Sequence, residues 1–114
     1  MKDFLVLFRE ADGRKANKHT QEEIQAHREN WAEWFAQWTK AGNLVGGNSL
    51  SLEGRMIKGD GDIITDQIHQ VGTEIVGGFL LLKAESLEQA TAIAASCPIY
   101  EFDGYAEIRG MQNQ

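Results

Sequence analysis

The stretch IVGGFLLLKAESLEQATAIAASCP, residues 75–98, decides the fold, because it holds a strand and a helix with both of its ends. The run 75–83, apolar except for glycines and the closing Lys83, has the length of a buried strand. Ser86 and Gln89 have the spacing of a capping box, whose side chains bind unpaired N–H groups at a helix start. Apolar residues then recur at three- and four-residue steps until Pro98, which cannot continue a helix. We therefore predict a strand followed by an amphipathic helix.

The segments before this stretch repeat the pattern. Residues 4–8, FLVLF, predict a first strand, which charged residues and a turn follow. A second capping box, Thr20 with Glu23, predicts the start of a long helix, and Gly42 predicts its end. One face of this helix carries apolar and aromatic side chains at helical spacing: Ile24, His27, Trp31, Trp34, Phe35 and Trp38.

The remaining elements complete a known arrangement. Residues 44–52 and 55–57 predict two strands that a short turn joins into one hairpin arm, and 63–65 resumes extended structure. Residues 105–109 alternate with period two, which predicts the last strand. The order strand–helix–strand–strand–helix–strand is typical of an α+β, ferredoxin-like βαββαβ fold with an antiparallel sheet. We expect one domain over residues 1–114.

Composition narrows the function classes. The chain is 42% hydrophobic and 25% charged, which indicates a globular protein. Its net charge of −6 argues against a nucleic-acid partner, since phosphate binding needs a positive face. No apolar stretch approaches the roughly 20 residues that span a bilayer, and no signal peptide is recognisable, so no membrane partner is expected. With the single cysteine Cys97, this indicates a cytoplasmic protein.

The central strands predict a homodimer. The strand at 4–8 is apolar on both faces, and so is the strand at 79–82. A strand with one face in water should alternate instead. The predicted helices can cover only one face of the sheet, so a second copy of the same sheet is the simplest cover for the other. The alternative is that loops of the same chain cover the far face.

The sequence also resembles a known family. Thr65-Asp66 is followed by Glu74, by the stretch 75–98 and by the closing segment GYAEIRGM at 104–111. This arrangement resembles the YCII-related superfamily, and more closely its DGPF-type branch. The resemblance implies a ferredoxin-like protomer in a dimeric α/β barrel. It implies less about function, because some relatives act as dehydrochlorinases and others look regulatory.

The sequence departs from the family pattern at two places that bear on chemistry. The family turn TDGPF is here TDQIH, with Gln67, Ile68 and His69 in place of Gly, Pro and Phe. Family members of the YCII type pair a His of the first helix with an Asp just before the Pro that ends the second. Here Trp31 and Cys97 occupy those positions, so we expect this His–Asp pair to be absent.

The loop from Asp66 to His69, with Glu74 beyond it, is the first candidate site. A carboxylate beside an imidazole orients the ring and raises its basicity, which general-base catalysis requires. The spacing of these residues is not that of a metal site, and no glycine-rich nucleotide motif is present, so neither a metal nor a cofactor is expected. The alternative is that Asp66 caps a turn and His69 is solvated.

The long helix carries the second candidate site. Trp31, Trp34 and Trp38 could line an apolar pocket between helix and sheet, with His27 as a base beside them. Arg55 could hold a carboxylate of the ligand through two hydrogen bonds. The alternatives are a packed aromatic core, a structural His27, and a pairing of Arg55 with Glu53 or with a neighbouring strand.

Two functions stay open on this basis. The first is a small-molecule-binding protein, in its enzymatic form using His and Asp for acid–base chemistry on a small aromatic or carbonyl ligand. The second is a non-catalytic, dimeric interaction or regulatory module. A pocket of a few hundred Å³ with converging polar groups would favour the first, and a solid core the second.

Overall fold

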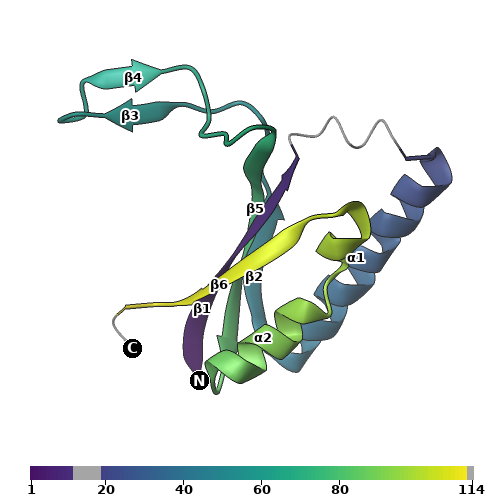
Figure 1. Ribbon diagram of the computed structural model, residues 1–114. Coiled ribbons are helices and arrows are strands. Elements are labelled where there is room, and N and C mark those ends of the chain that lie inside the picture. The colour runs from purple at the N-terminus through teal and green to yellow at the C-terminus, as the bar shows by residue number, and fades with distance from the viewer. Residues whose placement is uncertain (12–18, 113–114) are drawn as a thin grey trace.

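The computed structural model describes residues 1–11 and 19–112 (Figure 1). Its main sheet has four strands in the order β2-β5-β1-β6, with antiparallel neighbours throughout. These strands are β1 (Lys2–Ala11), β2 (Leu44–Ser49), β5 (Glu74–Ala84) and β6 (Tyr105–Gly110). The helices α1 (Gln21–Ala41) and α2 (Leu87–Ala95) both lie on one face of it. This arrangement confirms the predicted α+β, ferredoxin-like fold.

Both helices begin where the caps predicted. The Thr20 hydroxyl accepts the N–H of Glu23 at 3.1 Å, and the Glu23 carboxylate accepts the N–H of Thr20 at 3.0 Å. Gly42 ends α1 with a φ of 87°, which a residue without a Cβ adopts at little cost. Ser86 likewise accepts the N–H of Gln89. The Gln89 side chain accepts from Glu85 rather than from the cap itself.

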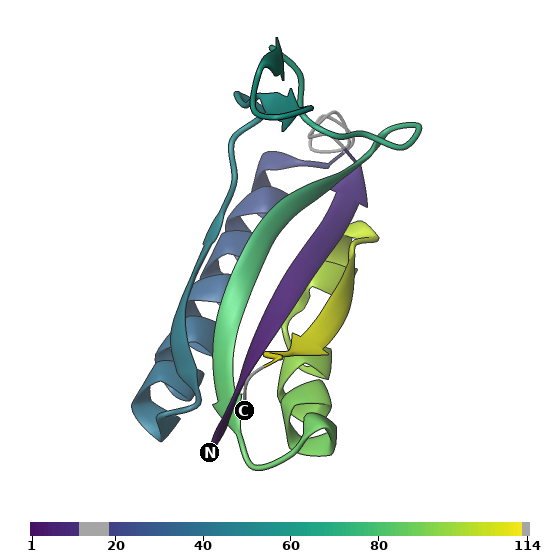
Figure 2. The ribbon, with the colours of Figure 1, turned by 90° about the vertical axis from the view of Figure 1, so that its left-hand side faces the viewer.

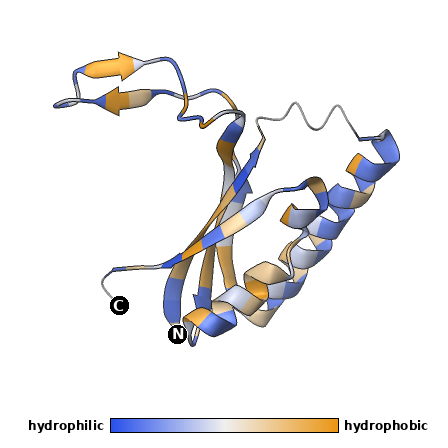
Figure 3. Ribbon diagram, viewed as in Figure 1, coloured by the Kyte–Doolittle hydropathy of each residue, from blue (hydrophilic) through white to orange (hydrophobic). Residues whose placement is uncertain are grey.

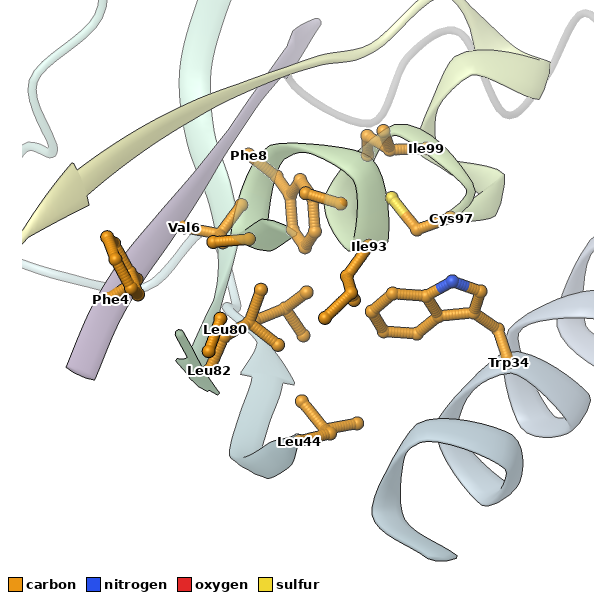
Figure 4. Close-up of a cluster of buried hydrophobic side chains, with 13 residues drawn as sticks. Phe4, Val6, Phe8, Trp34, Leu44, Leu80, Leu82, Ile93, Cys97 and Ile99 are labelled. Atoms are coloured by element: carbon orange, nitrogen blue, oxygen red, sulfur yellow. The ribbon is translucent and has the colours of Figure 1, made fainter. Parts of the chain in front are cut away.

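The hydrophobic core lies between the helices and the sheet (Figure 4). Val6 and Leu80 face each other across β1 and β5, and both are almost fully buried, as is Leu82. Trp34 enters from α1 and Ile93 from α2. The helix that follows α2 is a short 3₁₀ helix, η2 (Pro98–Phe102), because Pro98 has no N–H with which to continue α2.

A separate hairpin corrects one sequence prediction. The strand β3 (Met56–Lys58) pairs with β4 (Ile63–Thr65) and not with the 44–52 segment, so the expected hairpin between those two segments is wrong. Gly59 and Gly61, at φ 67° and 93°, form the turn that brings β3 and β4 together. We call residues 56–65 the arm.

The arm projects from the side of the sheet that the helices leave uncovered (Figures 1 and 2). The radius of gyration is 15.6 Å. A compact domain of this length would have about 13 Å. Ile57 and Ile64 face each other on the arm and are 66% and 58% exposed. The arm therefore presents apolar side chains that nothing in the described part of the protomer covers.

The uncovered side of the main sheet is also apolar. Leu5 pairs with Leu81, and Leu7 with Phe79, and all four are only partly buried. We call these four residues the open face; Figure 3 shows the apolar colouring of β5 and of the arm. At the rim, ion pairs join Asp3 to Lys83 and Arg9 to Glu107, both at 3.0 Å. Among the helices of the described residues, none combines the length and hydropathy needed to cross a bilayer.

Candidate functional site

A cavity of about 510 Å³ lies between α1 and the sheet, and we call it the α1 pocket. Helix α1 contributes His27, Arg28, Trp31 and Phe35 to its wall. Strands β1, β2 and β5 form the sheet side, with Ile99 of η2 beside them: Phe8, Glu10, Gly47, Asn48, Ser49, Gly77, Gly78, Phe79 and Leu80. The pocket thus combines aromatic walls with a few polar groups, as ligand sites do.

His27 is held in the wall of this pocket by two hydrogen bonds. Its Nδ1 lies 2.8 Å from Oε1 of Glu101, and its Nε2 accepts the indole N–H of Trp31 at 3.1 Å. Because an indole can only donate, Nε2 must carry a lone pair, and the ring proton sits on Nδ1, facing Glu101. Asn30 donates to the other oxygen of Glu101 at 2.9 Å, so this carboxylate is fixed as well.

An aromatic stack fixes the plane of the His27 ring. His27 stacks on Phe102 with ring centres 4.1 Å apart, and His19 stacks on Phe102 at 3.8 Å. Phe102 and Glu101 both belong to η2, so the short helix after Pro98 supplies two of the contacts that orient the imidazole. The carboxylate binds one ring nitrogen, and the other, Nε2, points to Trp31 in the pocket wall.

The pair of His27 and Glu101 was not predicted from the sequence or from the family resemblance. The His–Asp pair itself is absent, but His27 of the first helix still finds a carboxylate after the second helix. Glu101 lies 74 residues away in sequence, beyond Pro98 rather than before it. A partner at that separation leaves no local sequence signal, so only its position next to the Pro could have suggested it.

Glu10 is a second polar group that the sequence did not single out. It lies at the end of β1 and lines the α1 pocket, with its carboxyl packed over Gly77. Burial raises the pKa of Glu10 above its usual value, while the charge of a protonated His27 acts to lower it. The pocket therefore holds a carboxyl and an imidazole, from β1 and α1.

The three tryptophans that were predicted to line one pocket have different surroundings in the structure. Trp31 lines the α1 pocket and contacts Phe8 edge-on, with ring centres 5.5 Å apart. Trp34 is only 5% exposed, belongs to the core, and donates to the Ser96 hydroxyl at 2.9 Å. Trp38 packs against the core, and its buried indole N–H has no partner within the described residues.

The loop candidates lie elsewhere. Arg55 donates to Asp66 at 2.7 Å, and both side chains are largely exposed, at 70% and 83%. His69 instead lines a second hollow of about 330 Å³, together with Arg9 and Glu74. Glu74 accepts the hydroxyl of Tyr105 at 2.8 Å. Asp66 is therefore paired with Arg55, while His69 and Glu74 line the second hollow, and none of these residues lines the α1 pocket.

Two further features concern reactive groups. Within residues 1–11 and 19–112, no cluster of three or more His, Cys, Asp or Glu side chains is suited to hold a metal ion. Cys97 is buried against the core, and burial raises the pKa of its thiol to about 11. The thiol therefore stays protonated at neutral pH and is a poor nucleophile.

The fold and the pocket together define a class: a ferredoxin-like α+β protein with a cavity between its long helix and its sheet. The chain belongs to the YCII-related domain family, whose model matches residues 12–112. This confirms the family resemblance of the sequence.

The solved structure of 5-chloro-2-hydroxyhydroquinone dehydrochlorinase from Burkholderia phenoliruptrix AC1100, in complex with 2,5-dihydroxybenzoquinone, is similar to this chain with a TM-score of 0.46. The two are 16% identical, over 96% of this chain and 95% of that one. No curated protein matches the chain.

Proposed function

We propose that this chain is a small-molecule-binding protein that uses His27 as an acid–base group in the α1 pocket. One observation carries the proposal: the hydrogen bonds from Glu101 through His27 to Trp31 end at a cavity of about 510 Å³. A cavity of this size suits a small ligand. A carboxylate behind the imidazole is the arrangement that supports proton transfer by the other nitrogen.

The chemistry follows from the ring nitrogen that faces Trp31. In the protein without ligand, the indole N–H occupies the Nε2 lone pair at 3.1 Å. A ligand hydroxyl or acidic C–H that takes the place of the indole would give its proton to Nε2. The imidazolium so formed keeps its Nδ1–H on Glu101, whose negative charge stabilises it. Trp31, Phe35 and Phe8 would hold an aromatic or carbonyl ligand by apolar contact.

The test is a thermal-shift screen of aromatic and keto acids, followed by affinity measurements on variants. We expect His27→Gln to weaken the binding of any ligand found by at least about tenfold, and to lower turnover by about 10²–10⁴-fold where turnover exists. Glu101→Gln should lower turnover more than affinity, because Glu101 orients the ring without lining the pocket.

His69→Ala is the matched control, because His69 lies in the second hollow. It should leave binding unchanged if the α1 pocket is the site. Loss of binding in His69→Ala, with binding intact in His27→Gln, would instead assign the function to the loop of Asp66 and His69 with Glu74.

A homodimer is the second proposal, and the open face favours it. The four strands have 10, 6, 11 and 6 residues, and a rise of about 3.3 Å per residue at about 4.8 Å spacing gives the sheet an area of roughly 500 Å². A stable interface needs about 800 Å² per partner. The apolar arm beside the open face can supply the rest, so a second copy with the same two surfaces is a matching cover. This association would also serve the alternative function, a non-catalytic interaction module.

A further inference from the structure

The place of Glu10 depends on an irregularity of the sheet. The pairing of β1 with β5 shifts between Phe8 and Arg9: Phe8 faces Gly78, while Arg9 faces Val76, so Gly77 is the extra residue of a bulge. The Glu10 carboxyl lies over this residue. A Cβ added at Gly77 would overlap Oε1 of Glu10 and would come within 2.7 Å of its carboxyl carbon.

The carboxyl of Glu10 has no hydrogen-bond partner within the described residues, although it is partly buried. Its oxygens are not fully enclosed, so a ligand in the α1 pocket can reach them. The other lining groups that titrate are His27 and Arg28, both from α1. Strands β2 and β5 contribute Asn48, Ser49, glycines and apolar residues, and η2 contributes only Ile99, so no other described lining group changes its charge.

We propose that Glu10 binds an ionised oxygen of a small organic anion as a neutral acid, and that Gly77 makes the room in which it does so. This rests on the function proposed for the α1 pocket and narrows its ligand class. A protonated carboxyl donates a short, charge-assisted hydrogen bond to an anionic oxygen. Arg28 at the wall supplies the positive charge that such a ligand requires.

The arrangement links ligand binding to a proton. Burial raises the pKa of Glu10 in the free protein, and a bound anion raises it further, because two negative charges then oppose each other. Above the pKa of the free protein, binding must therefore take up a proton. Affinity for the anion should fall about tenfold for each pH unit beyond it.

The experiment uses benzoate as the anion and benzamide as its neutral counterpart, with calorimetry between about pH 5.5 and about pH 8, where benzoate stays ionised. The wild-type protein should bind benzoate more weakly as pH rises, with proton uptake, and should bind benzamide with no such dependence. Glu10→Gln should bind benzoate with an affinity that is nearly independent of pH, because an amide donates without titrating.

Two results would overturn the proposal. If the wild-type protein binds no benzoate at about pH 5.5, the α1 pocket is not a site for an organic anion. A pH dependence that survives in Glu10→Gln and disappears in His27→Gln would assign the titration to His27. If ligand binding depends on His27 but not on Glu10, the function of the pocket stands and only the role of Glu10 fails.

Gly77→Ala fills the space that the Glu10 carboxyl occupies but leaves Glu10 itself in place. The flexible Glu10 side chain can move away from the new Cβ, so we expect benzoate affinity to fall at least about tenfold with a small change in melting temperature. Gly46→Ala is the matched control, because a Cβ there meets nothing within 4 Å and Gly46 does not line the pocket. Equal affinities in both variants would contradict the proposed role of Gly77.

A second measurement needs no ligand. A carboxyl whose pKa is raised in the folded protein makes the fold less stable as pH rises through that pKa, because ionisation is then favoured in the unfolded chain. Glu10→Gln should therefore melt at a higher temperature than the wild type at about pH 8, and the difference should vanish below about pH 4. A variant that is less stable at all pH values would show that Glu10 is structural.

Discussion

Replacing Trp34 by alanine should lower the free energy of unfolding by about 3–5 kcal/mol, the range for a large aromatic side chain in a packed core. Trp34 joins α1 to both the sheet and α2: it lies among Leu44, Ile93 and Cys97, and its indole donates to Ser96. The cavity left by alanine would lie at the centre of these contacts. Urea denaturation followed by far-ultraviolet circular dichroism measures the loss.

Two control variants separate packing from the hydrogen bond. Trp34→Phe keeps most of the ring volume but cannot donate to Ser96, and Ser96→Ala removes the acceptor. Each should cost less than Trp34→Ala, on the order of 1–3 kcal/mol. A loss of less than about 1 kcal/mol in Trp34→Ala would show that Trp34 does not belong to the core and would reopen the idea of an aromatic pocket wall.

The second large effect concerns the open face. If two copies associate through it, Leu7→Asp should place a carboxylate in an apolar interface twice, once for each protomer. Burying an unpaired charge costs several kcal/mol, so the dissociation constant should rise by more than about 10³-fold. Light scattering coupled to size exclusion should then show a shift from twice the protomer mass to 12.7 kDa.

Leu87→Asp is the control for this variant. Leu87 is 50% exposed at the start of α2, on the helix side of the sheet, where a carboxylate suits the helix N-terminus. It should leave the mass unchanged. A wild-type protein that already runs at 12.7 kDa would refute the dimer and would leave the open face and the arm in water.

Most of the fold could be predicted because its signals are local. The capping groups of Thr20 and Ser86, the stop at Gly42 and the apolar run of β5 each act over a few residues. The pairing of β3 with β4 was missed because three-residue strands carry little periodicity. Their partner choice depends on the turn at Gly59 and Gly61 rather than on the strands themselves.

The candidate site was harder to predict because its members come from distant parts of the chain. His27 could be predicted from its place on the helix. Glu101 meets His27 only because η2 follows α2, and Glu10 has room in the pocket only because of the bulge at Gly77. The sequence pointed to the loop of Asp66 and His69 because the polar residues of this loop are neighbours along the chain. In space, Asp66 binds Arg55, and His69 lies in a different hollow.

The buried thiol of Cys97 has a practical consequence. A sulfhydryl that remains protonated and shielded does not compete for maleimide or iodoacetamide reagents in a folded sample. A cysteine introduced at an exposed site, such as Lys58→Cys on the arm, would then be the one group that takes up a fluorophore or spin label. If two copies associate, spectroscopic distances between their labels could be measured without first altering the native sequence at Cys97.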